Sequence, residues 1–233
     1  MVCHVDHLVV LAADLESGVH WSEEILGMTP GPGGAHPLMG THNRLLQIAG
    51  PRFPDAYLEI IAIDPSVRPQ RAAPLARWFD FDDRTLQDEL LRHGPRLAHW
   101  VARTDALQSC VSKWLGLGID RGPALEASRM TPHGLLSWRI TVRDDGQRLF
   151  DGCLPTLIEW GDVHPARTMA ASGLVLEQLH LQHPRADDLH TALEAAELVG
   201  LGESIKVAKG PYSLRADLRR PDGTLLSIGG PAP

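Results

Sequence analysis

VDHLVVL at residues 5–11 and YLEIIAI at residues 57–63 are the two stretches from which the fold can be read. Both are rich in β-branched and aromatic residues, which favours β-strands. Alternate side chains of a strand share a face, so His7 and Glu59 each fall in an otherwise apolar row. A carboxylate buried in such a row is costly unless it is paired, hydrogen-bonded or bound to a metal ion. The two stretches therefore predict strands that bring a histidine and a glutamate into a special environment.

The same pairing recurs later in the chain. RLAHWVA at residues 96–102 carries His99, and LPTLIEW at residues 154–160 carries Glu159. Two imidazoles and two carboxylates suit a divalent ion such as Zn, Ni, Co, Mn or Fe(II). The alternative is that each of these residues lies on the solvated face of its strand. Their recurrence at matching places favours a shared metal site.

The order strand–helix–strand–strand–strand begins three times along the chain, near residues 4, 96 and 174. This repeat predicts an α+β protein of three such units. In the third unit Ser227 takes the place of the glutamate, as expected if only the first two units share the site. The predicted organisation is a first unit at 1–63, a linker and inserted helix at 64–95, a second unit at 96–162 and a third at 173–230.

Two helices have clear sequence boundaries. Asp14 is an expected N-cap for the first helix, and Gly27 is its expected end. Asp82 or Asp83 is expected to cap the inserted helix, which Gly94 ends. The aromatic residues of RWFDF, at 77–81, are expected to anchor the linker that precedes this helix.

Composition narrows the classes of function. The chain of 233 residues is 43% hydrophobic and 22% charged, as in ordinary globular proteins, and its net charge is -7. It has no basic block, so nucleic acid is not an expected partner. No apolar run is long enough to span a bilayer, and no signal peptide is recognised, which predicts a cytoplasmic protein. The three cysteines are expected to be reduced, at positions 3, 110 and 153.

The chain resembles the vicinal oxygen chelate superfamily, which includes glyoxalase I, extradiol dioxygenases and bleomycin-resistance proteins. More narrowly, it is similar to bacterial glyoxalase-like domain proteins. The resemblance covers residues 4–160, and its carrying stretches are DHLVV, DLESGVHWSEEILGM, GGAHPLMGTHNRLLQI and YLEIIAIDP. It implies paired β-α-β-β-β modules whose curved sheets form an open barrel around a cleft. It also implies that the metal ligands are His7, Glu59, His99 and Glu159.

The resemblance implies a function as well. A metal-dependent lyase, isomerase or dioxygenase of this superfamily holds adjacent oxygens of a small oxygenated metabolite on a divalent ion. Glu59 or Glu159 would then serve as the catalytic base. The alternative is a metal-free protein of the bleomycin-resistance type, which binds or sequesters a small molecule.

Three further residues are candidates for contact with the substrate. His42 is predicted to face the cleft, and Asn43 to bind substrate or shape the strand entry. Arg139 is predicted to bind an anionic group of the substrate. His36, in a loop rich in glycine and proline, is expected at the surface. The unpaired third unit is expected to cover a flank or to contact another chain, with a homodimer as the favoured assembly.

Overall fold

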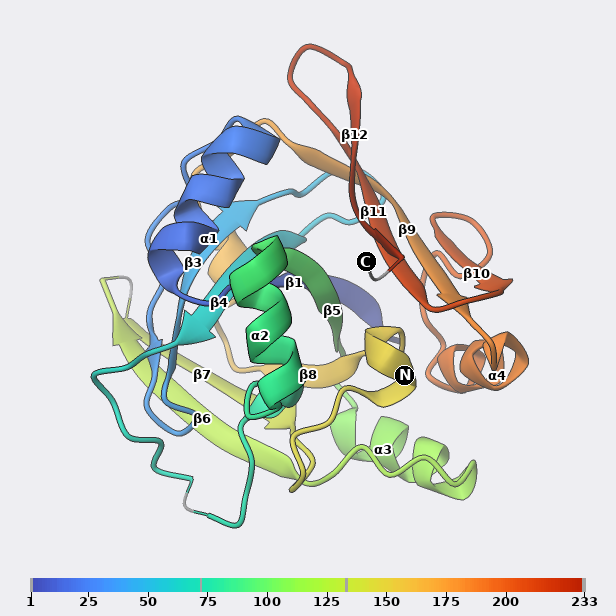
Figure 1. Ribbon diagram of the computed structural model, residues 1–233. Helices are drawn as coiled ribbons and strands as arrows, with labels where there is room; N and C mark the ends of the chain where they lie inside the picture. The colour runs from blue at the N-terminus through green and yellow to red at the C-terminus, as the bar shows by residue number, and fades with distance from the viewer. Residues whose placement is uncertain (1, 72, 133, 232–233) are drawn as a thin grey trace.

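The computed structural model describes residues 2–71, 73–132 and 134–231, which form two β-sheets (Figure 1). One sheet has eight strands in the order β2-β3-β4-β1-β5-β8-β7-β6, and the other has four in the order β10-β9-β11-β12. The strands of the first sheet are β1 (His4–Leu11), β2 (Ala35–His36), β3 (Thr41–Gln47), β4 (Tyr57–Ile63), β5 (Arg96–Arg103), β6 (Ala124–Thr131), β7 (Gly134–Thr141) and β8 (Thr156–Trp160). Those of the second are β9 (Val175–His183), β10 (Ile205–Lys209), β11 (Ser213–Arg219) and β12 (Leu225–Pro231).

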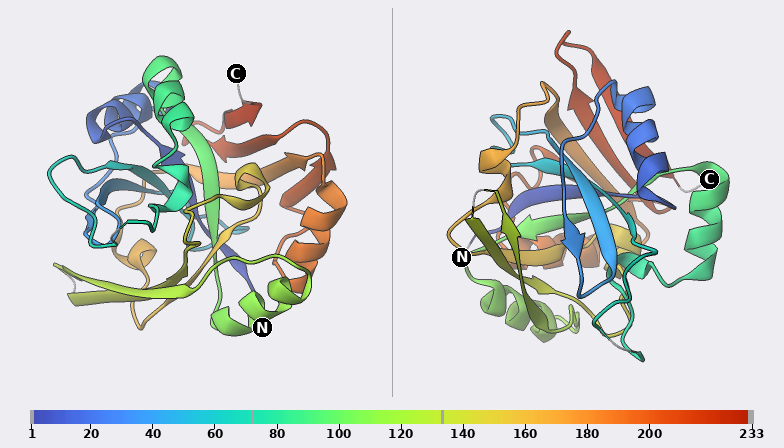
Figure 2. Two further views of the ribbon diagram at one scale, coloured as in Figure 1. Left: turned by 60° about the horizontal axis from the view of Figure 1, so that its bottom comes forward. Right: turned by 90° about the vertical axis from the view of Figure 1, so that its left-hand side faces the viewer.

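A helix follows the first strand of each unit. These helices are α1 (Leu15–Trp21), α3 (Leu107–Gly116) and α4 (Ala186–Ala195). The expectation of an α+β fold with repeated β-α-β-β-β units is thus confirmed. Figure 2 shows that the eight-stranded sheet is curled, with β6 and β7 bending round toward β3 and β4.

The first two units join through their opening strands. β1 pairs antiparallel with β5, and each of these strands also pairs parallel with the closing strand of its own unit, β4 or β8. This pairing makes one continuous sheet from two units. It also places His7 and His99 on neighbouring central strands.

The two faces of the curled sheet have different surroundings. The outer face carries Leu8, Leu58 and Trp100, and the three helices and the four-stranded sheet pack against it in one large core. The third unit therefore covers a flank of the same chain, beside β1 and β5 in Figure 1. The inner face carries Val9, Ile61, Val101 and Ile158.

The predicted insertion supplies part of the lining of the inner face. Its aromatic stretch forms the short helix η2 (Trp78–Asp80), and α2 (Arg84–His93) follows. Trp78, Phe79 and Phe81 are buried against the inner face together with Leu86 and Leu90 of α2. The anchoring role expected for these aromatic residues is what the structure has. Burial of several such side chains stabilises the insertion by on the order of 1.5–3 kcal/mol each.

Local signals explain where the helices begin and end. The Asp14 carboxylate accepts a hydrogen bond from the backbone N–H of Ser17 at 2.7 Å, and Gly27 ends the following turn with a left-handed φ of 73°. Asp83, one of the two residues predicted, caps α2. In the described part of the chain, no helix combines the length and apolar character needed to cross a membrane. The remaining short helices are η1 (Ser22–Leu26), η3 (Leu149–Gly152) and η4 (Pro165–Thr168).

Candidate active site

His7 and Glu59 lie side by side on the inner face of the sheet. Residue alternation on β1 and β4 directs both side chains to this face, and the two strands are neighbours. The distance between His7 Nε2 and Glu59 Oε2 is 3.5 Å, and the two side chains are only 5% and 8% exposed. The Tyr57 ring stacks on the His7 ring with centroids 4.6 Å apart. A charged pair is therefore held in a largely apolar setting.

A buried carboxylate orients His7 from behind. Asp6 is fully buried, and its Oδ1 lies 2.6 Å from His7 Nδ1. A register shift between Val5 and His7 in the β1–β5 pairing accompanies this close approach of sequence neighbours. Because Asp6 engages Nδ1, the Nε2 atom of His7 is the one that faces Glu59.

Two further donors satisfy Asp6. Trp160 donates through Nε1 to Asp6 Oδ2 at 2.9 Å, and His164 Nε2 lies 2.8 Å from the same oxygen. His164 Nδ1 accepts from the backbone N–H of Ala166, so its proton is on Nε2, where it is donated to Asp6. Asp6 is thus the centre of a network that connects β1, β8 and η4.

The network keeps its acids and its base charged. Burial alone would lower the pKa of His7, but hydrogen bonds with Asp6 and Glu59 outweigh it and raise the pKa to about 9. Burial would raise the pKa of Asp6, yet the bonds from His164 and His7 hold it well below its usual range. Glu59 follows the same pattern, with His7 and Asn43 lowering its pKa against the effect of burial. At neutral pH the group is carboxylate–imidazolium–carboxylate.

We predict that the free energy of unfolding falls as pH rises from about 6.5 to about 9. The pKa of His7 is raised in the folded state, so its contribution is complete below its unfolded pKa and is lost as pH passes about 9. The loss is on the order of 3 kcal/mol. Urea unfolding at pH 6, 7.5 and 9 measures it, and His7→Gln is the control that lacks this slope. Parallel slopes for wild type and His7→Gln would contradict the prediction.

Asn43 holds the other oxygen of Glu59. Its Nδ2 donates to Glu59 Oε1 at 2.6 Å, while its Oδ1 accepts from the backbone N–H of Gly34 at 2.7 Å. The Gly34 contact fixes which end of the amide faces Glu59. The prediction that Asn43 lies at the cleft agrees with this placement, and its role toward a substrate stays a prediction.

The glycine pair before His36 makes close packing possible. An added Cβ at Gly33 would collide with the backbone and amide oxygens of Asn43. An added Cβ at Gly34 would collide with the guanidinium group of Arg129. Both positions therefore need the absence of a side chain, because Asn43 and Arg129 occupy that space.

His36 is buried at the site, which corrects its expected surface position. Its side chain lies inside because Ala35 and His36 pair with β3 and turn the imidazole toward the inner face. The Nδ1 atom is 3.1 Å from Thr41 Oγ1, and Nε2 is 3.9 Å from Glu59 Oε1. Burial lowers the pKa of His36 to about 4, so the ring is neutral at pH 7.

Arg129 has buried nitrogen atoms without hydrogen-bond partners. Within the described residues, neither its Nε nor its Nη1 has a partner. Sequence reasoning did not select this residue because ALEASRMT (124–131) reads as an ordinary half-exposed strand. Asp6 and His164 were missed too, since neither contact is between residues in an apparent motif.

His99 has a structural environment instead of an open metal-facing one. Its Nδ1 lies 3.1 Å from the carbonyl oxygen of Gly152, and its Nε2 accepts from the backbone N–H of Thr156 at 3.2 Å. Both ring nitrogens are thus used by the protein. Burial lowers the pKa of His99 well below its usual value, which keeps the ring neutral.

Glu159 lies on the outer side of β8, away from His7 and Glu59. Its neighbours Ile158 and Trp160 point to the inner face, so strand alternation directs Glu159 to the other side. It forms an ion pair with Arg139, which crosses from β7. Arg139 is therefore engaged by a carboxylate of the chain itself.

Strand register explains why Glu159 does not match Glu59. In the first unit, Glu59 pairs with the residue two positions after His7, which is Val9. In the second unit, the residue two positions after His99 is Val101, and its partner is Thr156. Thr156 is therefore the counterpart of Glu59, and this corrects the predicted equivalence.

His42 points away from the site. It neighbours Asn43 on β3, and consecutive side chains of a strand face opposite ways. Its Nδ1 lies 3.7 Å from the Asp64 carboxylate, in a partly exposed position. The predicted cleft-facing position of His42 is thus corrected by the register of β3.

Three adjoining cavities surround the His7–Glu59 pair. The reactive cavity, of about 30 Å³, is lined by His7, Asn43, Glu59 and Arg129 together with aromatic and aliphatic side chains. It has room for a single small group. A larger space of about 740 Å³, the polar cavity, shares His36 with it. The third, the apolar cavity, of about 540 Å³, shares Arg129 with it.

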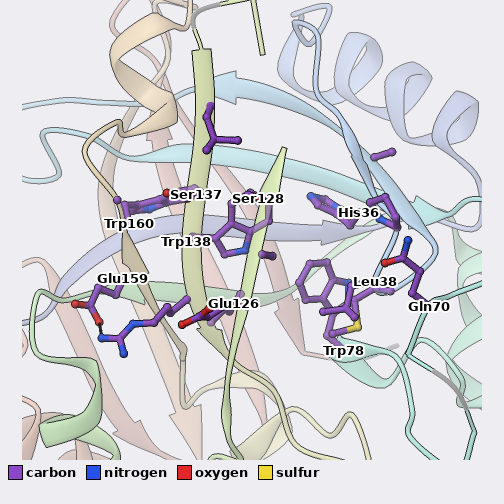
Figure 3. Close-up of a pocket in the computed structure, with 18 residues that line it drawn as sticks. His36, Leu38, Gln70, Trp78, Glu126, Ser128, Ser137, Trp138, Glu159 and Trp160 are labelled. Atoms are coloured by element: carbon purple, nitrogen blue, oxygen red, sulfur yellow. Dashed lines mark hydrogen bonds and ion pairs between the residues drawn. The ribbon is translucent and has the colours of Figure 1, made fainter. Parts of the chain in front are cut away.

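Figure 3 shows the polar cavity, with His36 and Trp78 on one side and Trp138 and Trp160 on the other. Glu126 and the Glu159–Arg139 ion pair lie at its far side. The predicted substrate residue Arg139 therefore lines a cavity, but one that adjoins the reactive cavity and does not contain Glu59.

The sequence profile of the glyoxalase-like domain matches residues 5–198. The chain therefore belongs to the glyoxalase-like domain family, and the resemblance to the vicinal oxygen chelate superfamily is confirmed. No curated protein matches the sequence.

Solved structures support the fold. A hypothetical protein from Staphylococcus aureus is 14% identical, with a TM-score of 0.58, and the match covers 98% of this chain and 86% of that one. Methylmalonyl-CoA epimerase from Mycobacterium tuberculosis is 16% identical over 67% of this chain and 85% of that one, with a TM-score of 0.37. A mutant of 4-hydroxymandelate synthase from Streptomyces coelicolor is 14% identical over 97% and 62%, with a TM-score of 0.45.

The four predicted ligands do not fit a shared metal ion. His99 has no free ring nitrogen, and Glu159 lies on the opposite face of the sheet. Among the residues that the structure describes, no group of three or more His, Cys, Asp or Glu side chains is arranged to hold a metal ion. Metal binding by the remaining pair, His7 and Glu59, stays a prediction.

Proposed function

We propose that this protein is an isomerase or lyase that moves a proton at a carbon next to the carbonyl group of a small oxygenated metabolite. The observation that carries the proposal is the buried pair of Glu59 and His7, 3.5 Å apart at the reactive cavity. A carboxylate is a proton acceptor, and an imidazolium is a proton donor, so the pair has both functions that such a reaction needs.

Each group has a distinct role in the proposed step. Glu59 takes the proton from carbon, the C–H electron pair forms a carbon–carbon double bond, and the carbonyl oxygen becomes an oxyanion. His7 donates through Nε2–H to that oxygen. The enol intermediate then takes the proton back at a neighbouring carbon, or loses a group from it. Asp6 holds the His7 ring throughout, and Asn43 holds the Glu59 carboxylate.

The free state leaves His7 available for this role. The 3.5 Å between His7 Nε2 and Glu59 Oε2 exceeds the roughly 2.7–3.2 Å of a well-formed hydrogen bond. A substrate oxygen that takes the Nε2 proton removes its stabilising effect on the Glu59 carboxylate. The pKa of Glu59 then rises, which makes it a stronger base once the substrate is bound.

The expected classes are thereby narrowed to isomerase and lyase, because the proposed groups carry out proton transfer. The metal-dependent form of these activities stays a prediction that His7 and Glu59 alone would have to support. The metal-free binding protein is the second expected class, and the experiment below separates it. A cytoplasmic location and a homodimer also stay predictions from the sequence.

Solvent deuterium exchange tests the proposal directly. Protein purified without a histidine tag is incubated in D₂O with a panel of 2-oxo acids, 3-oxo acids and α-hydroxy ketones, and NMR follows loss of the α-C–H signals. We expect exchange in at least one compound class, and it should survive exhaustive dialysis against a chelator. The panel is repeated with dialysed protein after metal content has been measured.

The possible outcomes have separate meanings. Exchange that disappears on dialysis and returns with a stoichiometric divalent ion would reject the metal-independent proposal and support the metal-dependent prediction. Binding of panel members without any exchange would reject catalysis and support the sequestering protein.

A further inference from the structure

The apolar cavity lies on the opposite side of the reactive cavity from the polar cavity. It shares Arg129, Leu45, Leu136 and Pro165 with the reactive cavity. Its other walls come from the loop before β2, with Met28 and Pro32, and from the segment after β8, with Val163, Met169 and Ala170. At about 540 Å³ it has the size of a small-molecule site. Its position means that a ligand in it would extend directly to Glu59.

Arg129 stands where the two cavities meet. Its Nε and Nη1 atoms are buried and have no hydrogen-bond partner among the described residues. A buried cation without a partner is costly, so a ligand that neutralises it gains binding energy. The planar guanidinium fork matches the two oxygens of a carboxylate. The Gly34 position is free of a side chain, and this leaves the guanidinium its space.

The combination of an apolar space and an unpartnered cation defines one class of ligand. We infer that the substrate is a 2-oxo acid or related carboxylate with an apolar tail. The reacting carbon lies beside Glu59, the carboxylate pairs with Arg129, and the tail extends past the Arg129 stem into the apolar cavity. This inference rests on the proposed function for the reacting end, whereas the tail and carboxylate sites concern binding alone.

Binding of a chain-length series tests the inference. Isothermal titration calorimetry measures the dissociation constants of straight-chain 2-oxo acids of increasing length, from 2-oxobutanoate to 2-oxodecanoate. We expect binding to tighten about fourfold for each added methylene, which corresponds to ~0.8 kcal/mol. Arg129→Met is expected to weaken binding of every acid at least tenfold, and Arg129→Lys to weaken it less.

Two tryptophan variants identify the cavity that holds the tail. Ala170 is exposed at the apolar cavity and Ala35 is exposed at the polar cavity, so both substitutions are matched. Ala170→Trp is expected to abolish the dependence on chain length, and Ala35→Trp to preserve it. Thr168→Trp, exposed at the same rim as Ala170, is used if Ala170→Trp does not fold. Thermal unfolding checks the fold of each variant.

Binding that does not change with chain length would overturn the inference. So would a dependence that Ala35→Trp removes and Ala170→Trp leaves intact. Calorimetry does not require turnover, so failure of the two proposals can be distinguished. Chain-length-dependent binding without deuterium exchange rejects the proposed function alone, whereas exchange with equal affinity for all lengths rejects the tail site alone.

Discussion

Glu59→Gln is expected to lower the rate of deuterium exchange by roughly a thousandfold, because the amide does not accept a proton from carbon. Glutamine preserves the size of the side chain and its hydrogen bond from Asn43, which is 2.6 Å in the wild type. The variant should therefore remain folded. Initial exchange rates, measured by NMR with the best compound of the panel, give the size of the effect.

Glu159→Gln is the matched control for this prediction. It makes the same change at the glutamate that the sequence pattern presents as the equivalent of Glu59, but on the other face of the sheet. Its exchange rate should stay close to that of the wild type. Equal losses in the two variants would show that Glu59 is not the base.

Asp6→Asn is expected to destabilise the protein by roughly 3–5 kcal/mol, a large part of the stability of a typical domain. The substitution removes the charge that pairs with the His7 imidazolium. It also places an amide group among donors from His7, Trp160 and His164, which cannot all be satisfied. Urea unfolding at pH 7 measures the change in the free energy of unfolding.

An exposed aspartate provides the control for Asp6. Asp64 also lies beside a histidine, His42, at 3.7 Å, but it is accessible to solvent. Asp64→Asn should change stability little, because exposed ion pairs contribute little. The double variant Asp6→Asn with His7→Gln should lose less than the sum of the single changes. Strict additivity would show that Asp6 and His7 do not form the coupled pair described.

Strand alternation was sufficient to predict one half of the site. His7 and Glu59 each interrupt an apolar row, and the rows are on adjacent strands, so their meeting follows from the pattern. The same reasoning failed for Glu159 because a face depends on odd or even spacing within the strand. The register of β8 places Thr156, three residues earlier, opposite Val101. No signal in LPTLIEW reveals that register.

Burial and occupancy are different properties, and His99 illustrates the difference. Its apolar row correctly predicted an enclosed position, but not the backbone groups of Gly152 and Thr156 that occupy its ring. His36 was missed for the opposite reason. Its loop has the composition of an exposed turn, and only the packing of Gly33 and Gly34 against Asn43 and Arg129 reveals that the loop is buried.

The replacement of a second glutamate by Thr156 has a stereochemical consequence. Of the described residues that line the reactive cavity, Glu59 alone is a carboxylate, and the neighbouring walls at Phe79 and Trp138 are aromatic. A planar enol held between them has one basic side and one inert side. The proton leaves and returns on the same side, so a chiral carbon handled there would keep its handedness. A scaffold made of two similar halves thus works with a single hand.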